Sequence, residues 1–239
     1  KYQNIKPIIT PRFTPSCTDE LMKELAVLQA ETKSPLQSHL SENEGEIQWV
    51  QALSPESKFY GDAYDRCGAF GSNGSTVMAH CVHSDEQERK LMKERGVYVA
   101  HCPESNTNLS SGIAPARAYL EEGINIGLGS DVAGGHELSM FRVIKAAIQV
   151  SKLRWRLVDQ SQKPLSMEEA FYMATKGGGS FFGKVGSFEE GYEVDALVLD
   201  DSRLNPTMEL SSANRLERLI YSIENQDIKD IYVAGKKLN

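Results

Sequence analysis

Residues 75–101 read STVMAHCVHSDEQERKLMKERGVYVAH, and this pattern sets the architecture that we expect. The apolar run at residues 75–80 predicts a strand, residues 85–95 predict a helix that ends at Gly96, and residues 97–101 predict a second strand. A strand, a helix and a strand in this order are typical of a parallel β/α unit. Both predicted strands end in a histidine, His80 and His101.

The same alternation continues on both sides of this unit. Strands are predicted at residues 6–10, 35–41 and 125–129, and helices after Thr18 and at residues 44–53, 113–122, 138–158 and 167–175. A short helix is also expected near residues 60–66. The strand ends carry His39 and Asp131, and Arg12 follows the first strand. Because the C-terminal ends of parallel strands form the active-site face of a β/α barrel, these side chains are expected to gather in space.

The last part of the chain has a different pattern. Residues 186–200 and 228–238 read as β-strands with a turn, which predicts a small β-rich appendage. We therefore predict an α/β catalytic domain over residues 1–184 and part of a small β-rich domain over residues 185–239.

Composition excludes several classes of protein. The net charge of −7, with no dense Lys/Arg run, argues against a nucleic-acid partner. No apolar stretch is long enough for a membrane span, and the first residues lack an apolar signal core. The cysteines do not form a C-x-x-C pair, so we expect reduced thiols and a cytoplasmic location.

Candidate chemistry begins with His39 and Glu42, an imidazole at a strand end and a carboxylate three residues later. Neutral imidazole is a good zinc ligand, and a nearby carboxylate can accept a proton from water. Taken singly, each residue has a plainer interpretation: His80 as a buried hydrogen-bonded histidine, Asp131 as a helix cap, Arg12 as a surface ion-pair partner and Phe13 as core. The order His, His, Asp on alternating strand ends favours a metal site over those interpretations.

Several segments resemble the guanine deaminase family of the amidohydrolase superfamily. They are TPRFTPSC at residues 10–17, QSHLSE at 37–42, MAHC at 78–81, HCPESN at 101–106, GLGSDVAGG at 127–135, GSFEEG at 186–191 and VAGK at 233–236. The resemblance covers nearly the whole chain. It implies the C-terminal part of a TIM-like (β/α)8 metal-dependent hydrolase barrel, with strands of a small β-sandwich appendage.

The resemblance also implies roles for individual residues. His39, His80 and Asp131 correspond to metal ligands, Glu42, His80 and Asp131 to catalytic residues, and Arg12, Phe13, Gln37, His39 and Glu42 to substrate-binding residues. It implies hydrolysis of guanine, a small purine, to xanthine and ammonia, with one zinc ion as the cofactor and iron or manganese as alternatives. One ion is expected because residues 10–13 lack the lysine that bridges two metals in other members. Resembling members are often homodimers.

One departure from the family pattern is the absence of His-x-His, which supplies two further ligands in the family. The expectation is that this chain is the C-terminal portion of a longer protein. Two alternatives stay open: another amidohydrolase deaminase acting on an adenosine-like, cytosine or triazine substrate, and a non-catalytic fragment or scaffold.

Overall fold

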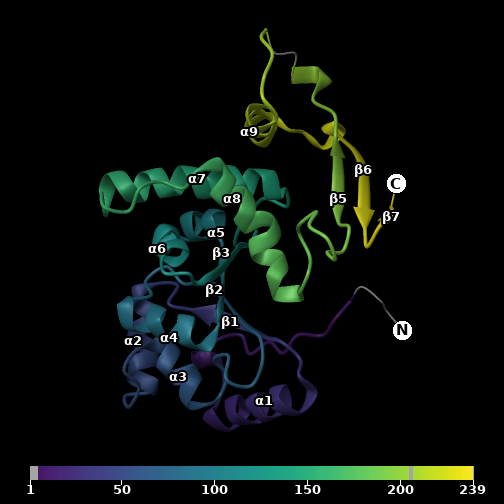
Figure 1. The fold of residues 1–239 in the computed structure, drawn as a ribbon. Helices are drawn as coiled ribbons and strands as arrows, with labels where there is room; N and C mark the ends of the chain where they lie inside the picture. Colours follow the sequence, from purple (N-terminus) through teal and green to yellow (C-terminus); the bar gives the residue numbers. More distant parts are fainter. Residues whose placement is uncertain (1–4, 205–206, 239) are drawn as a thin grey trace.

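A four-stranded parallel sheet lies at the centre of the computed structural model, which describes residues 5–204 and 207–238 (Figure 1). Its strands, in spatial order, are β1 (Leu36–Leu40), β2 (Thr76–His80), β3 (Tyr98–His101) and β4 (Asn125–Leu128). The four corresponding predictions are confirmed to within one residue at each end. All three pairings are parallel, so the C-terminal ends of the strands lie along one edge.

The strand predicted at residues 6–10 is reduced to a single parallel bridge between Ile9 and Leu36. Ile9 donates its N–H to the Pro35 carbonyl and accepts from Gln37, at 2.9 and 2.8 Å. Prolines 7 and 11 bracket this contact, and proline has no N–H to extend a ladder. The segment still runs beside β1 and brings the Arg12 carbonyl to His39, near the C-terminal end of that strand. Among the described residues the sheet is open, with these five neighbouring segments forming part of the predicted barrel.

Three of the helices around the sheet begin where short polar side chains accept backbone N–H groups. Thr18, Asn43 and Asp85 cap the first three long helices in this way. Gly96 ends the third in the left-handed conformation. The helices up to β4 are α1 (Asp19–Thr32), α2 (Glu44–Leu53), α3 (Tyr60–Arg66), α4 (Glu86–Arg95), α5 (Pro103–Asn108) and α6 (Ala116–Glu121). The predictions for α2 and α3 are confirmed at both ends, α6 begins later than predicted because it follows Pro115, and α5 was not predicted.

Side-chain burial alternates along β1. Leu36, Ser38 and Leu40 are buried towards the helices, whereas Gln37 is exposed and His39 is half-buried on the other face. The buried face joins a core that includes Met22, Val50, Tyr64, Met78, Met92, Val99, Tyr119 and Ile126. β1 therefore buries one face in the core and carries the polar side chains of Gln37 and His39 on the other.

Three further helices follow β4, namely α7 (Met140–Leu157), α8 (Met167–Tyr172) and α9 (Ser212–Ser222). The helix predicted at residues 167–175 continues past α8 as a π-helical turn, Met173–Gly177. That turn packs on β4, where a Cβ at Gly127 would lie 2.7 Å from the Gly178 Cα. Only glycine permits this approach. No helix among the described residues has both the length and the apolar character that crossing a membrane requires.

The predicted β-rich tail forms an antiparallel sheet of β5 (Ala196–Leu199), β6 (Ile228–Val233) and β7 (Lys236–Lys237). Figure 1 shows this sheet standing apart from the parallel one. Ile220 of α9 packs with Ile144 and Ile148 of α7, so the tail shares an apolar cluster with the preceding part. The division at residues 184 and 185 stays a prediction.

Candidate active site

Three titratable side chains from three strand ends meet at the C-terminal edge of the sheet. His80 Nε2 lies 3.7 Å from Glu42 Oε2 and 4.0 Å from Asp131 Oδ2. The His39 ring stacks on the His80 ring, with centroids 5.2 Å apart and planes 17° from parallel. The structure thus brings together His39, Glu42, His80 and Asp131, which the sequence placed at three different strand ends.

His39 is oriented by the backbone of the segment beside β1. Its Nδ1 lies 2.5 Å from the Arg12 carbonyl oxygen. Because a carbonyl only accepts, Nδ1 carries the proton in this contact and Nε2 keeps a lone pair. The ring is therefore prepared to act as a ligand through Nε2.

His80 reaches the same place through an unusual backbone conformation. Its register partner, Leu40, is buried against the helices, so strand alternation assigns His80 to that face. Its φ of 73° departs from strand geometry, and the ring instead stacks on His39. A positive φ in a non-glycine residue is costly and gathers at functional sites. The side chain is held by Asn106, whose Oδ1 lies 2.9 Å from Nδ1.

The two carboxylates each accept a hydrogen bond from a serine. Ser111 Oγ donates to Glu42 Oε1 at 2.8 Å, and Ser105 Oγ donates to Asp131 Oδ2 at 2.6 Å. A Cβ at Gly134 would lie 2.7 Å from both Asp131 Oδ2 and Ser105 Oγ. Glycine is therefore required at this position to leave room for the Ser105–Asp131 hydrogen bond.

The predicted substrate-binding residues border this cluster. The Arg12 guanidinium lies over the Phe13 ring, 5.1 Å from its centroid, and is exposed. Phe13 meets His39 edge-on, with ring centroids 6.3 Å apart. Gln37 shares the open face of β1 with His39, and its Nε2 donates to Thr10 Oγ1 at 3.1 Å. Phe13 thus borders His39 directly, and Gln37 lies on the same face of β1.

The side-chain donors of the cluster are of types that bind metal ions, although their positions do not form a complete coordination site. Among the described residues, no group of three or more His, Cys, Asp or Glu side chains has the arrangement of a metal site. Both imidazoles nevertheless have Nδ1 engaged by an oxygen, which leaves Nε2 as the donor, as metal-binding histidines require. With the Asp131 carboxylate, the set is two nitrogens and one oxygen, which zinc accepts.

Four residues near the cluster were not identified from the sequence. Ser105, Asn106 and Ser111 follow β3, the fourth predicted strand, and this position was one available signal. The family-like segment HCPESN at residues 101–106 was a second signal for Ser105 and Asn106. Glu46 lies in the first turn of α2 and is buried. Burial raises the pKa of Glu46, the charge of Glu42 raises it further, and Tyr60, His39 and His80 oppose the shift.

His101 and Cys102 do not join the reactive cluster. Burial and the neighbouring His80 lower the pKa of His101 to about 4, so its ring is neutral at physiological pH. Burial raises the pKa of Cys102 to about 12, which argues against a thiolate nucleophile. All four cysteines are free thiols.

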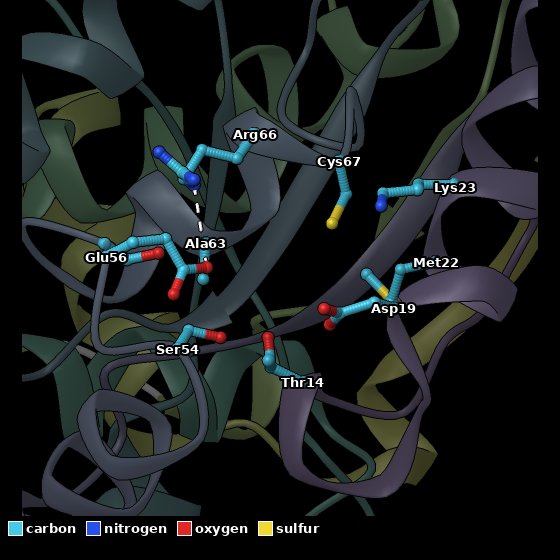
Figure 2. A pocket seen from close by; sticks show the side chains of 10 residues that line it. Thr14, Asp19, Met22, Lys23, Ser54, Glu56, Ala63, Arg66 and Cys67 are labelled. Atoms are coloured by element: carbon cyan, nitrogen blue, oxygen red, sulfur yellow. Dashed lines mark ion pairs between the residues drawn. The ribbon is translucent and has the colours of Figure 1, made fainter.

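A separate cavity of about 140 Å³ lies on the helix-covered side (Figure 2). It is lined by residues of the η1 turn (Thr14–Ser16), α1, α3 and the loop after α2. Figure 2 shows the Thr14 hydroxyl and the Cys67 thiol pointing into it. Burial raises the pKa of Cys67. None of the strand-end residues lines this cavity, so we place the candidate site at the sheet edge instead.

Comparison with known proteins relates the chain to a large group of hydrolases. The amidohydrolase family model matches residues 2–238. The chain is 38% identical over 241 residues to a guanine deaminase of Dictyostelium discoideum, an alignment that covers 98% of this chain and 53% of that protein. It spans about half the length of the curated relatives it matches.

Solved structures agree with this relationship. The structure of a guanine deaminase from C. acetobutylicum with bound guanine gives a TM-score of 0.94 at 53% identity, over 98% of this chain and 55% of that one. An adenosine deaminase from Xanthomonas campestris with bound zinc gives 0.82 at 27% identity, over 95% of this chain and 50% of that one.

Proposed function

The chain belongs to the amidohydrolase family, and from that premise we propose that it supplies proton-transfer and purine-binding residues for hydrolytic deamination of guanine to xanthine and ammonia. The observation that carries the proposal is the meeting of His39, His80, Glu42 and Asp131 at one sheet edge. Support for guanine as the substrate comes from the 53% identity to a guanine deaminase with bound guanine.

His39, His80 and Asp131 are the residues that would hold a metal ion. Zinc is the proposed ion, as a single equivalent, because a solved relative carries it and the donors suit it. When bound, zinc polarises water and lowers its pKa towards 7. Metal analysis of the purified protein distinguishes zinc from iron and manganese.

Glu42 is the proposed proton carrier of the reaction. Its carboxylate takes a proton from the attacking water and passes it to a ring nitrogen, which makes C2 of guanine electrophilic. The water oxygen then bonds to C2, and the carbon–nitrogen bond to the exocyclic amine breaks. Asp131 carries the second water proton to that amine, which leaves as ammonia. His80 Nε2 faces both carboxylates, so a group held there would lie within reach of both proton carriers.

Arg12, Phe13 and Gln37 are proposed to bind the purine. The guanidinium can donate to the guanine carbonyl oxygen or a ring nitrogen, and the Phe13 ring offers an apolar face to the flat base. The Gln37 amide lies on the same face of β1 as His39 and can donate or accept. Together they would hold C2 near the carboxylates.

The test is to measure guanine turnover, through the release of ammonia, in the natural protein that carries this sequence. Glu42→Gln is expected to lower kcat by about 10²–10⁴, the usual contribution of a general acid–base group. Glu44→Gln is the matched control, because Glu44 is exposed two residues away in the first turn of α2. A Glu42→Gln enzyme that keeps its rate within about tenfold of wild type would contradict the role assigned to Glu42.

A substrate panel separates the alternatives. Turnover of an adenosine-like, cytosine or triazine substrate in preference to guanine would replace the proposed substrate. Absence of ammonia release from every substrate, together with substoichiometric zinc, would favour a non-catalytic scaffold.

A further inference from the structure

One short segment after β3 contacts catalytic residues from three other strand ends. Within residues 103–111, which we term the clamp segment, Ser105 donates to Asp131 and Ser111 donates to Glu42, while Asn106 pairs with His80. The three contacts measure 2.6, 2.8 and 2.9 Å respectively. A single rigid piece of chain can therefore fix all three side chains relative to one another.

The three clamp residues are buried, although all are polar. Their exposed fractions are 0% for Ser105, 1% for Asn106 and 6% for Ser111. Buried polar groups are costly unless they are hydrogen-bonded, and in low dielectric those bonds are stronger than in water. The contacts to the catalytic residues are therefore not readily exchanged for water.

Hydrogen bonds outside the cluster hold the clamp segment itself. Ser111 N–H donates to the Asn106 carbonyl at 2.8 Å, which closes the turn between the two clamp residues. His83 Nε2 lies 2.8 Å from the Ser111 carbonyl oxygen, and Asn108 Nδ2 donates to the Gly134 carbonyl at 2.8 Å. The turn is thus anchored both to the loop after β2 and to the loop that follows Asp131.

The contact to Glu42 distinguishes the two oxygens of its carboxylate. Oε1 accepts from Ser111, whereas Oε2 faces His80 Nε2 at 3.7 Å. With Oε1 occupied by the serine proton, Oε2 is the oxygen left free to accept a proton from water. Asn106 acts similarly on His80, because an amide oxygen at Nδ1 selects the tautomer with a lone pair on Nε2.

We propose that Ser105, Asn106 and Ser111 are positioning residues, and that Ser111 acts through Glu42 by reserving Oε2 for proton transfer. This inference rests on the proposed deaminase function. It assigns to the clamp segment a role that neither metal binding nor contact with the purine provides.

A double-mutant cycle in the natural protein tests the role of Ser111. Ser111→Ala is expected to lower kcat about 10- to 100-fold with KM unchanged, the range for residues that orient catalytic ligands. In a Glu42→Gln background, Ser111→Ala should not lower kcat further, because Ser111 affects the reaction only through the Glu42 carboxylate. Ser111→Thr keeps a hydroxyl and should restore most of the rate, and Ser111→Cys, which keeps the shape, serves if the alanine variant does not fold.

Thr107→Ala is the matched control. Thr107 is an exposed residue of the same segment, and its hydroxyl donates to the Pro103 carbonyl instead of to a catalytic residue. Equal losses from Ser111→Ala in the wild-type and Glu42→Gln backgrounds would overturn the proposal, as would a loss no larger than that of Thr107→Ala.

A second measurement does not depend on turnover. Asn106→Ala should weaken zinc affinity about 10- to 100-fold in chelator competition, whereas Ser111→Ala and Thr107→Ala should not. If wild type releases no ammonia from guanine, the proposed function fails, and the clamp is then judged by this zinc series. If wild type is active but the series and the cycle show no effect, the clamp fails and the function stands.

Discussion

Replacing Tyr64 with phenylalanine removes a hydroxyl that joins the segment after Arg12 to the end of β1. The ring is fully buried in the core, and its hydroxyl donates to the His39 carbonyl at 2.9 Å and accepts from Thr14 N–H at 3.1 Å. Ser38 Oγ lies 2.8 Å away. Because Tyr64→Phe keeps the ring, no cavity forms, and the effect comes from the polar groups left behind.

The cost can be estimated from those groups. Ser38 keeps a second partner, the Arg12 carbonyl, so the two backbone groups of Thr14 and His39 carry most of the loss. An unsatisfied buried polar group costs about 1–3 kcal/mol, which predicts about 2–4 kcal/mol for the variant when partial access of water to Thr14 is allowed. With a urea m-value of about 2–3 kcal/mol/M, the unfolding midpoint should fall by about 1 M.

Tyr60 provides a matched control. Its ring stacks on the Tyr64 ring, with centroids 5.6 Å apart, and its buried hydroxyl makes no hydrogen bond to a backbone group among the described residues and faces the side chains of Glu46 and Tyr64. Tyr60→Phe should therefore lower the free energy of unfolding by less than Tyr64→Phe does, because it leaves no backbone group without a partner. Urea unfolding of both variants, followed by circular dichroism, gives the comparison. Equal midpoints for Tyr64→Phe and Tyr60→Phe would refute the assignment of stability to the Tyr64 hydrogen bonds.

Three other residues, Gly134, His101 and Glu88, each give a prediction about activity or stability. Gly134→Ala should displace the side chains of Asp131 and Ser105, because the new Cβ would lie 2.7 Å from Asp131 Oδ2 and from Ser105 Oγ. The variant should therefore have a lower kcat with little change in Tm. A fall in Tm that accompanies the fall in kcat would contradict this prediction. Burial lowers the pKa of His101 to about 4 in the folded protein, against 6.5 in the unfolded chain, so the unfolded chain binds more protons between these two pH values. The free energy of unfolding should therefore fall by about 3 kcal/mol as the pH drops through this window. His101→Leu should flatten that part of a plot of Tm against pH. Glu88 accepts hydrogen bonds from Ser41 Oγ and Gly61 N–H, and burial raises its pKa, so ionisation of its carboxyl group lowers the stability of the fold as pH rises. Glu88→Gln should therefore raise Tm more at pH 8 than at pH 5. An equal change in Tm at both pH values would count against this effect of ionisation.

The strands and their polar ends could be predicted from the sequence because the signals are local. Apolar runs between polar helices define β1 to β4, and parallel strands in sequence order must place His39 and Asp131 at one edge. Residues 6–10 were predicted as a strand, but only the Ile9 bridge forms, because Pro7 and Pro11 have no N–H groups with which to extend the ladder.

The clamp residues could not be predicted in the same way. Helix α5 has only six residues, PESNTN, and these provide no apolar periodicity. Ser111 and Glu42 are 69 residues apart, so their contact depends on packing across the whole sheet. The sequence predicted His80 in the same site as His39, although strand alternation alone would turn its ring to the helix-covered face. The positive φ of His80, 73°, is the feature that the sequence did not predict and that brings the ring onto His39.

The left-handed backbone of His80 has a consequence for anyone who wishes to transplant this site into another β/α scaffold. Ser41, Cys81 and Asp131 also adopt positive φ at or beside the strand ends, at 45°, 49° and 48°. A graft that copies the side chains onto ordinary strand ends would point the second histidine into the packing layer. The transferable unit is therefore the histidine together with its torsions and the neighbouring bend, and a graft of this unit should fail wherever the host chain cannot bend at the strand tip.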